Sequence, residues 1–353
     1  MQFGLNFFPC VGPDQKPAAQ YFREAMHLCS LTDELGMTHI RQVEHYFKPY
    51  GGYSPNPLVF LTAAAMRTRN TRLISGAVLP AFNSPLKLAG EIGMLDGISN
   101  GRLEVGFARA FLPHEFAQFG VSLDESRKRF TEGLSQITML LKDENVSSKG
   151  EFHSFSNVTS LPRPTQKPHP PFWIAATNTP ETFAFAGTNG CKVMAIPLEP
   201  TNMRQLIGTY REAWKKAGHP GNGQVMNTFF MCCMPTREEA MAVGAPAANQ
   251  HLKGLADAAK EWVSGGASTK DYPGYDKLIA HVSSDTAERQ VRDGSAFIGT
   301  PADIVEMLRS YNDKVGGIDS VSLHFTPANM PVEMAERSLR LFSKEVMPKV
   351  AAL

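Results

Sequence analysis

The most constraining feature of this chain is a regular alternation of strand-like and helix-like segments along nearly its whole length. Short apolar runs bounded by turn residues predict eight strands, and longer segments with apolar residues at i, i+3 and i+4 predict the helices between them. Strands that alternate with helices form a parallel sheet with right-handed crossovers. The predicted strands are Phe3–Phe8, Thr38–Val43, Thr71–Val78, Arg102–Phe107, Pro171–Ala176, Cys191–Ile196, Val225–Cys233 and Asp319–Phe325.

The predicted helices have ordinary start and stop signals. Pro180, Pro301 and Pro331 stand at first-turn positions, where proline costs no hydrogen bond, and Leu35-Gly36 ends the first helix. The predicted helices are Ala19–Leu35, Pro57–Arg67, Pro85–Ile98, Ser126–Lys142, Pro180–Ala186, Met203–Ala217, Arg237–Trp262 with an interruption, Pro301–Asn312 and Pro331–Val346.

Eight such strands can close into a barrel or remain an open, doubly wound sheet. The count of eight, and the lack of a Gly-x-Gly-x-x-Gly motif after the first strand, favour an α/β chain folded as a (β/α)8 TIM barrel. In such a barrel the carboxyl ends of the strands share one face, which carries the active site. We expect one domain over residues 1–353.

Two segments depart from the barrel rhythm. The first, Asp143–Pro170, follows the fourth predicted helix and ends in a proline-rich stretch, which predicts a short hairpin and an extended connector. The second, Ser264–Gly294, is rich in glycine and polar residues and precedes the last β/α unit. We expect residues 264–294 to form a mobile loop over the active face, with an inert surface loop as the alternative.

Composition excludes several classes of protein. The net charge of +1 provides no basic field for nucleic acid, and no apolar run is long enough to cross a bilayer. The five cysteines have no metal-ligand spacing, and we expect no metal. An odd cysteine count without a secretory signal favours a cytoplasmic protein.

The end of the second strand carries a candidate catalytic histidine. His45 follows that strand at the expected active face, and histidine is the side chain whose charge changes near neutral pH. Glu44 could orient or charge the ring, although neighbouring strand residues point to opposite faces. The alternative is a structural histidine with satisfied hydrogen bonds.

Two arginines and a turn indicate a phosphate site. Arg109 follows the fourth strand and Arg127 opens the next helix, and a guanidinium is suited to phosphate. The alternative for Arg127 is an exposed charge paired with Asp124 or Glu125. The turn before Pro180 would point free N–H groups at the same face, with a simple cap by Asn178 or Thr179 as its alternative. The turn residues are Ala176, Thr177 and Asn178.

Small residues end the third strand. Ser75, Gly76 and Ala77 would let a flat ring lie against the backbone, although tight barrel packing explains them equally well. Because proton-transfer groups are few and phosphate and ring contacts are many, we infer that a cofactor performs the difficult chemistry. The candidate walls of an apolar cavity are Phe7, Phe60, Phe111, Leu112 and Trp262.

Taken in order, these motifs resemble the bacterial luciferase-like flavin-dependent monooxygenases, and most of all the luciferase α-subunit. The resemblance covers nearly the whole chain. It rests on Glu44-His45-Tyr46-Phe47, Ser75-Gly76-Ala77-Val78-Leu79-Pro80, Leu95-Asp96-Gly97-Ile98-Ser99-Asn100-Gly101-Arg102, Gly106-Phe107-Ala108-Arg109 and Gly299-Thr300-Pro301.

The resemblance implies a two-component enzyme that uses FMNH2 supplied by a separate flavin reductase. With O2 as co-substrate it would form a C4a-(hydro)peroxyflavin, which hydroxylates or Baeyer–Villiger-oxidises a small, carbonyl-containing molecule. Pairing through helices near the second and third units would give a homodimer, with Pro85–Ile98 as its apolar face.

The resemblance also assigns roles to individual residues. His45 would lie beside the reacting part of the flavin, Arg109 and Arg127 would hold its phosphate, and the turn of Ala176, Thr177 and Asn178 would complete that site. Ser75-Gly76 would be a non-proline cis peptide under the ring. Ala108 stands where luciferase has its reactive cysteine, which argues against light emission.

Three other functions remain open at this stage. The first is a deazaflavin (F420)-dependent oxidoreductase on the same barrel, and the second is a non-catalytic flavin-binding subunit. The third, an unrelated phosphate-binding barrel such as an aldolase, is disfavoured because no strand end carries a lysine suited to a Schiff base.

Overall fold

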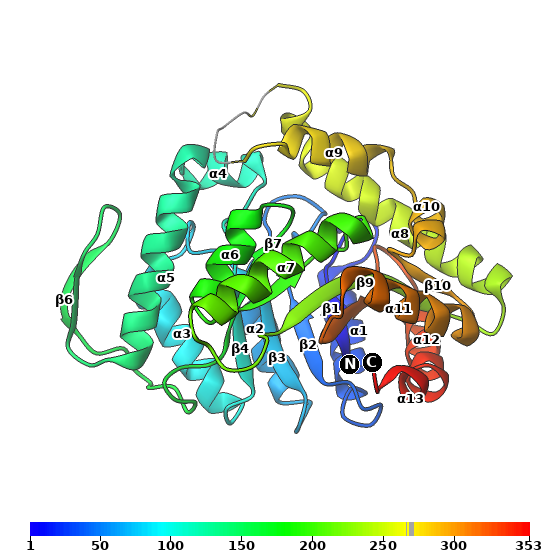
Figure 1. Cartoon of the computed structure of the whole chain (residues 1–353), viewed down its shortest axis with the longest axis horizontal. Helices are drawn as coiled ribbons and strands as arrows, with labels where there is room; N and C mark the ends of the chain where they lie inside the picture. The colour runs from blue at the N-terminus through cyan, green and yellow to red at the C-terminus, as the bar shows by residue number, and fades with distance from the viewer. Residues whose placement is uncertain (266, 268–271) are drawn as a thin grey trace.

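Eight parallel strands close into a barrel. Figure 1 shows the strands at the centre of the computed structural model, which describes residues 1–265, 267 and 272–353. The strands follow one another around the barrel, and pairing of Val193 with Val225 joins the sixth strand to the seventh. All eight predicted strands are confirmed. They are β1 (Gln2–Phe7), β2 (His39–Gln42), β3 (Arg72–Val78), β4 (Leu103–Phe107), β7 (Phe172–Ala176), β8 (Lys192–Ala195), β9 (Val225–Cys233) and β11 (Ser320–His324).

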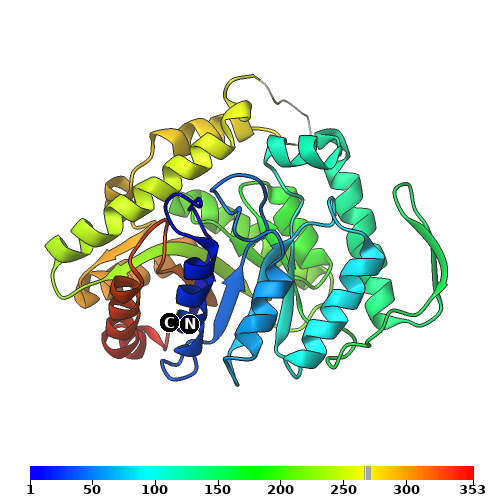
Figure 2. The ribbon, with the colours of Figure 1, turned by 180° about the vertical axis from the view of Figure 1, so that it is seen from behind.

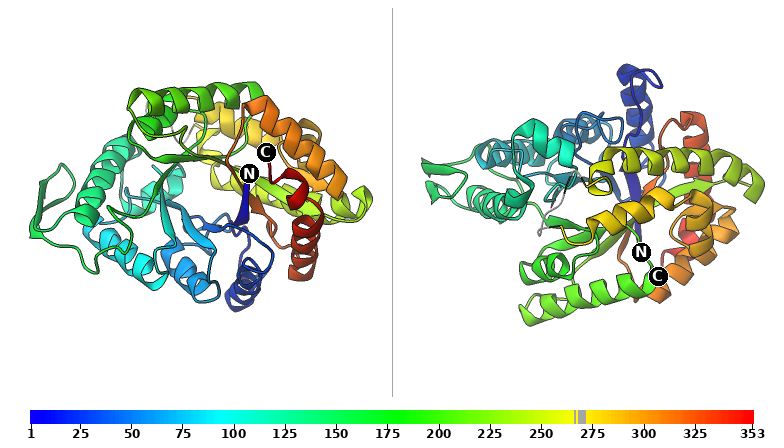
Figure 3. Two further views of the ribbon diagram at one scale, coloured as in Figure 1. Left: turned by 60° about the horizontal axis from the view of Figure 1, so that its bottom comes forward. Right: turned by 90° about the horizontal axis from the view of Figure 1, so that it is seen from above.

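Helices surround the barrel, as the view in Figure 3 from the lower end makes clear. The chain ends lie side by side (Figure 2), where the amino group of Met1 donates to the carbonyl oxygen of Ala351 at 2.9 Å. The longer helices are α1 (Ala18–Ser30), α2 (Pro57–Ala65), α3 (Pro85–Ile98), α5 (Ser126–Lys142), α6 (Pro180–Thr188), α7 (Pro200–Lys216), α8 (Arg237–Ala258), α11 (Pro301–Val315) and α12 (Val332–Glu345).

Several elements were not predicted from the sequence. A short strand, β10 (Phe297–Gly299), pairs with the end of β9 outside the closed barrel. Helix α4 (Pro113–Phe119) follows β4, and α13 (Met347–Val350) ends the chain. The short 3-10 turns η1 (Leu123–Glu125) and η2 (Lys260–Trp262) precede α5 and follow α8. Helix α8 continues through Pro246, so the predicted interruption falls only at its end.

The first insertion is confirmed and the second is more regular than expected. Strands β5 (Val146–Lys149) and β6 (Ser154–Val158) form the predicted antiparallel hairpin, which projects from the body in Figure 1. Within residues 264–294 the chain forms α9 (Tyr275–Ser284) and α10 (Ala287–Asp293) instead of a loop. Buried Tyr275 and Ile279, four residues apart, give α9 an apolar face. Residues 266 and 268–271 of the predicted loop lie outside the described residues.

The strands divide their side chains between two environments. In β2, Ile40 faces outward into the apolar core between strands and helices, whereas His39 and Arg41 face the barrel interior, because successive strand residues point to opposite faces. His39 lines a cavity at the amino-terminal end of the barrel and Arg41 lines a cavity at the carboxyl-terminal end. The inward side chains therefore form layers along the barrel axis.

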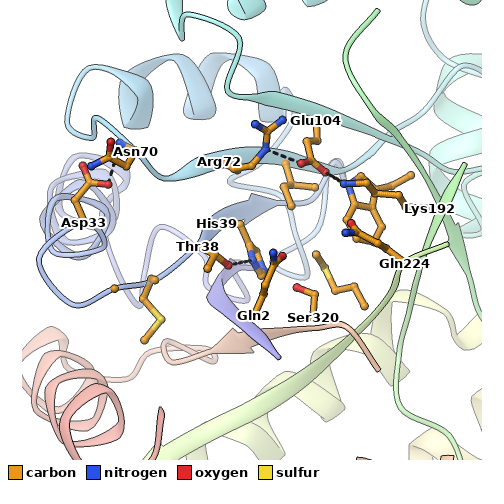
Figure 4. A pocket seen from close by; sticks show the side chains of 15 residues that line it. Gln2, Asp33, Thr38, His39, Asn70, Arg72, Glu104, Lys192, Gln224 and Ser320 are labelled. Carbon is orange, nitrogen blue, oxygen red and sulfur yellow. Dashed lines mark hydrogen bonds and ion pairs between the residues drawn. The ribbon is translucent and has the colours of Figure 1, made fainter. Parts of the chain in front are cut away.

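An ionic cluster occupies the amino-terminal layer (Figure 4). The Glu104 carboxylate lies 2.6 Å from Arg72 Nε and 2.9 Å from Lys192 Nζ, and Trp173 Nε1 donates to it at 2.6 Å. Burial alone would raise the pKa of Glu104, but the two cations and the hydrogen bonds outweigh burial and hold that pKa below its ordinary value. The cluster lines a cavity of about 350 Å³ at the face that (β/α)8 barrels use for stability.

No helix within residues 1–265, 267 and 272–353 is long and apolar enough to cross a membrane. The five cysteines are buried and unpaired.

We predict that Glu104→Gln lowers the free energy of unfolding by about 1–3 kcal/mol, because it leaves two cations without their buried counter-charge. Urea unfolding followed by tryptophan fluorescence measures the effect. The ionised Glu104 contributes stability above pH about 4.5, and this contribution disappears as the pH falls through its lowered pKa. The difference between variant and wild type should therefore shrink in acid.

The matched control is Glu91→Gln, which removes the exposed Lys87–Glu91 pair on α3. An exposed pair of this kind contributes only about 0–0.5 kcal/mol. Equal effects of the two substitutions would show that the buried cluster contributes nothing special to the barrel.

Candidate active site

A cavity of about 220 Å³ opens at the carboxyl-terminal end of the strands, beneath α8 and α9, which cross the barrel mouth in the right-hand view of Figure 3. This is the end at which the sequence analysis places the chemistry. Most of its surface is apolar. Its walls include Phe8, Arg41, His45, Gly76, Ala77, Ala108, Arg109, Phe111, Ala176, Thr177, Met194, Thr228, Tyr275 and Ile279.

His45 lies in this cavity between aromatic rings and a buried carboxylate. Its ring stacks on Phe8, with ring centroids 5.2 Å apart, and packs against Tyr50 and Phe111. Nδ1 lies 3.1 Å from Oε1 of Glu115. A carboxylate at Nδ1 fixes the ring so that Nε2 is the nitrogen that accepts or donates a proton.

The carboxylate that orients His45 is Glu115, and our expectation that Glu44 does so is wrong. Oε1 of Glu115 also accepts from the backbone N–H of Tyr46 at 2.8 Å, and its side chain is fully buried. Glu115 lies in the first turn of α4, a helix that the sequence analysis did not predict. An acidic residue two positions after Pro113 was the available signal, because proline and acids are both favoured in a first turn.

Glu44 points away from His45, as the alternation of side chains along a strand requires. Its oxygens accept from Tyr46 Oη at 2.5 Å, Asn83 Nδ2 at 3.0 Å and the N–H of Leu79 at 3.1 Å. Burial raises the pKa of Glu44 to about 8; the hydrogen bonds oppose this rise and the charge of Glu115 adds to it. Although Glu44 borders the cavity, its carboxylate holds the ends of β2 and β3 together.

The end of β3 provides a flat apolar surface, with one correction to the predicted backbone. The non-proline cis peptide joins Gly76 to Ala77, one bond later than predicted. Gly76 and Ala77 line the cavity, as does Ala108 at the end of β4. Ser75 does not, because it is fully buried and its hydroxyl bonds to the backbone of Gly106. Small side chains at this surface leave room for a planar ring.

The ends of β4 and β7, next to β3 in the barrel, add a cation and hydroxyl groups to the cavity. The Arg109 guanidinium lies 4.7 Å from the ring centroid of Tyr272. Thr177, at the end of β7, shares a hydrogen bond of 3.0 Å with the hydroxyl of Tyr275 on α9. The segment that we expected to cover the active face therefore contacts two of the predicted phosphate-binding residues, Arg109 and Thr177.

The turn after β7 leads into α6 without a side-chain cap. Thr179 is the N-cap residue, yet its side chain accepts no N–H of the helix. Oδ1 of Asn178 is buried and has no hydrogen-bond partner among the described residues. The simple cap considered for this turn is therefore not formed, and the N–H groups of the first turn remain suited to an anion.

Arg127 does not share the position of Arg109 in the wall of the cavity. It lies exposed in the first turn of α5 and is not among the residues that line the cavity. Its neighbour Glu125 pairs with Arg129 at 2.9 Å.

The apolar wall differs from prediction by one residue in β1. Phe7 packs outward on Phe60, with ring centroids 5.2 Å apart, whereas Phe8 faces the cavity. A shift of one residue moves a strand side chain to the other face. Phe111 lines the cavity as expected. Leu112 and Trp262 do not; they belong to a buried apolar cluster that also contains Tyr50 and Tyr275, which do line it.

Arg41 was not predicted at all. Its guanidinium lies inside the barrel, where Nη1 donates to Asn6 Oδ1 and Nη2 donates to the carbonyl oxygen of Gly76, both at 2.7 Å. No pattern in the sequence marks an arginine in the middle of a buried strand as part of a site.

This set of groups fits a phosphorylated cofactor with a planar ring. A guanidinium, a threonine hydroxyl and an uncapped helix start suit phosphate, and the flat surface at Gly76–Ala77 suits a ring system. No cluster of three potential metal ligands occurs within residues 1–265, 267 and 272–353.

Comparisons with known proteins agree with this geometry. A family model described as luciferase-like monooxygenase matches residues 1–316. The oxygenase component of the flavin-dependent trigonelline monooxygenase of Acinetobacter baylyi is 30% identical over 99% of this chain and 95% of its own length. The uncharacterised protein y4wF of Sinorhizobium fredii is 36% identical, with 56% of each chain aligned.

Solved structures show the same fold. Monooxygenase RslO1 of Streptomyces bottropensis superposes with a TM-score of 0.88 at 40% identity, over 99% of both chains. The oxygenating constituent of 3,6-diketocamphane monooxygenase of Pseudomonas putida, a type II Baeyer–Villiger enzyme in complex with FMN, gives a TM-score of 0.81 at 23% identity over 99% of this chain and 98% of its own. An F420-dependent secondary alcohol dehydrogenase gives 0.72 at 14% identity, over 99% and 98% of the two chains.

The match to the family model covers most of the barrel, and a relative aligned along nearly its full length is the oxygenase component of a flavin-dependent enzyme. A non-catalytic subunit and an unrelated aldolase-like barrel are therefore set aside. This chain belongs to the luciferase-like monooxygenase family and is a flavin-dependent monooxygenase.

Proposed function

We propose that the chain is the oxygenase component of a two-component monooxygenase that takes FMNH2 from a separate flavin reductase and uses O2 to oxidise a small organic molecule. The observation that carries the proposal is the arrangement within one cavity. Arg109 and Thr177 lie toward one side, the surface at Gly76–Ala77 forms a wall, and His45 is held by Glu115.

The phosphate of FMN would be held by Arg109, Thr177 and the start of α6. Rotation of the Asn178 amide would turn its NH2 group toward the same place, and the exposed Arg127 would reach the phosphate from α5. The ring would lie against Gly76, Ala77, Ala108 and Ala176, with Ser75 supporting this wall through its bonds to Gly106. When bound, reduced FMN supplies the electrons that activate O2.

His45 would transfer a proton at Nε2 to or from the reacting oxygen or substrate, while Glu115 stabilises its charged form. Glu44 would act indirectly, by fixing the strand ends beside His45. The rings of Phe8, Tyr50 and Phe111 would exclude water from this part of the cavity, which limits the wasteful release of hydrogen peroxide.

We infer that α9 and Tyr272 form a closing segment. The cavity of about 220 Å³ is smaller than most ligand sites, which span roughly 300–1,000 Å³. Tyr275 already bonds to Thr177, and Tyr272 lies against Arg109. Outward displacement of this segment would admit FMN, and its return would shield the reaction.

The names of the relatives are the basis for proposing a substrate class and a reaction type. One relative is named as the oxygenase component of a trigonelline monooxygenase, and another is named as a type II Baeyer–Villiger monooxygenase. By analogy, the substrate of this chain would be a compact molecule, carbonyl-containing or ring-shaped, that is hydroxylated or undergoes Baeyer–Villiger oxidation. We further propose a cytoplasmic location, which the five unpaired, buried cysteines support.

A homodimer through α2 and α3 is also proposed. We expected Pro85–Ile98 to provide the apolar face of the dimer. Leu88, Ile92 and Leu95 of this helix are buried within the chain, so they cannot contribute to that face. Met94 is 57% exposed, and Val59 on neighbouring α2 is 67% exposed. The other large apolar side chains exposed here are Leu86 and Ile98 on α3 and Met66 directly after α2.

The first test concerns the phosphate. Arg109→Met should weaken FMN binding roughly 10- to 100-fold, because it removes a charge-assisted hydrogen bond, and should leave riboflavin binding nearly unchanged, since riboflavin has no phosphate. Isothermal titration with FMN, riboflavin and reduced deazaflavin measures these affinities. Equal losses for FMN and riboflavin would contradict the assignment, and preference of the wild type for deazaflavin would favour the F420 alternative.

The second test concerns oxygenation. The protein with FMNH2 and ¹⁸O2 should transfer one labelled atom to a member of a panel of aldehydes, cyclic ketones and aromatic acids, detected by mass spectrometry. His45→Ala should lower product formation by about 10²–10⁴-fold and raise hydrogen peroxide release, while FMN affinity holds. An unchanged product yield in His45→Ala would rule out its role.

The third test concerns assembly. Met94→Lys should convert a dimer into a monomer in light scattering after gel filtration, because a charge is placed in an apolar contact. Phe22→Lys on α1, also at an exposed apolar position, is the control and should remain dimeric. A dimer unaffected by Met94→Lys would place the interface elsewhere.

A further inference from the structure

Among the residues that the structure describes, Arg41 is the one arginine that projects from a central strand position into the barrel between the cavities at its two ends. In β2 it follows the inward-facing His39 by two residues, and it borders the carboxyl-terminal cavity together with His45. Its side chain therefore forms part of the floor beneath the proposed flavin site.

Four other strands hold the guanidinium in place. Nη1 donates to Asn6 Oδ1 of β1 at 2.7 Å and to Thr228 Oγ1 of β9 at 3.3 Å. Nη2 donates to the carbonyl oxygen of Gly76 in β3 at 2.7 Å, and Nε points at Met194 Sδ of β8 at 3.4 Å. The position is thus fixed before any ligand binds, which is the condition for strong electrostatic stabilisation.

Gly76 is needed for this placement. A Cβ atom added at residue 76 would meet Nε of Arg41 at 2.1 Å. The absence of a side chain on β3 is therefore what allows the arginine of β2 to lie across the floor of the cavity.

Every acceptor that Arg41 reaches among the described residues is neutral. The nearby carboxylates are engaged elsewhere: Glu44 with Tyr46, Glu115 with His45, and Glu104 with the amino-terminal ionic cluster. Burial lowers the pKa of Arg41 to about 10, with Tyr50 opposing the shift, so the group remains charged at neutral pH. A buried charge without a counter-charge is costly unless something else pairs with it.

The guanidinium also keeps donors for a ligand. Of its five N–H groups, one on Nη2 has no acceptor among the described residues, and Nε faces only a thioether, which accepts weakly. We propose that Arg41 is the counter-charge for a planar, delocalised anion bound in this cavity. This proposal rests on the proposed function, because the anion is carried either by the substrate, as a carboxylate or enolate, or by the reduced flavin ring.

The experiment has two binding arms, neither of which depends on turnover. In the first, FMN-loaded protein is titrated with two pairs of ligands: benzoate and benzamide, and cyclohexanecarboxylate and its carboxamide. The two members of each pair share a shape and differ in charge. If the substrate carries the anion, the wild type binds an acid more tightly than its amide, and Arg41→Met reduces that preference at least about tenfold without changing amide affinity.

In the second arm, oxidised and reduced FMN are titrated anaerobically. If the flavin carries the anion, Arg41→Met weakens reduced FMN about tenfold and leaves oxidised FMN unchanged. Either selective loss supports the proposal. Unchanged preferences in both arms, or equal losses for the charged and neutral member of each pair, would overturn it.

Control variants separate charge from folding. Arg292→Met removes an arginine whose side chain is 71% exposed, and it should change neither arm. Arg41→Lys keeps the charge and should retain part of each preference. If Arg41→Met does not fold, Arg41→Gln carries the test, because it also removes the charge while keeping a polar amide in the floor of the cavity. Failure of oxygenation with intact charge selectivity would count against the proposed function alone.

Discussion

The structure depends on one geometric constraint, the alternation of side chains along short parallel strands in a closed barrel. Each strand directs only a few side chains inward, and each of these side chains lies in a single layer. In β2 this assigns His39 to the amino-terminal layer and Arg41 to the middle, while Ile40 packs outward. The ionic cluster of Glu104, Arg72 and Lys192 stabilises the amino-terminal end of the barrel. The carboxyl-terminal end remains open for a ligand.

A second consequence concerns charge. The buried carboxylates at the two ends of the barrel have defined partners, several of them from distant parts of the chain: Glu115 lies 70 residues from His45, and Glu104 lies 88 from Lys192. Pairing of this kind fixes the strand ends and gives His45 its orientation. Arg41 departs from the pattern, since its partners are neutral, and this contrast is the reason to seek an anionic ligand for it.

The strands, the barrel and the positions of His45, Arg109 and Thr177 could be predicted because local pattern and connectivity determine them. Phe7 was predicted to line the cavity, but Phe8 does so instead. Pattern alone is limited in this way, because a shift of one residue moves a side chain to the other face of the strand. Glu115 and Tyr275 were missed because both reach the site from short helices, α4 and α9, that were not predicted; the only signal for Glu115 was an acid in a first turn that begins at Pro113. Arg41 was missed because its role arises only when five strands bring their side chains together.

The central claim is that the carboxyl-terminal cavity is a flavin site with its phosphate at Arg109. A crystal structure of the protein soaked with FMN tests this most directly. The account predicts the phosphate in hydrogen-bond contact with Arg109 and Thr177, and the ring against Gly76 and Ala77, on the same side of the barrel as His45. Flavin bound in the cavity beside Glu104, or outside the barrel mouth, would contradict it.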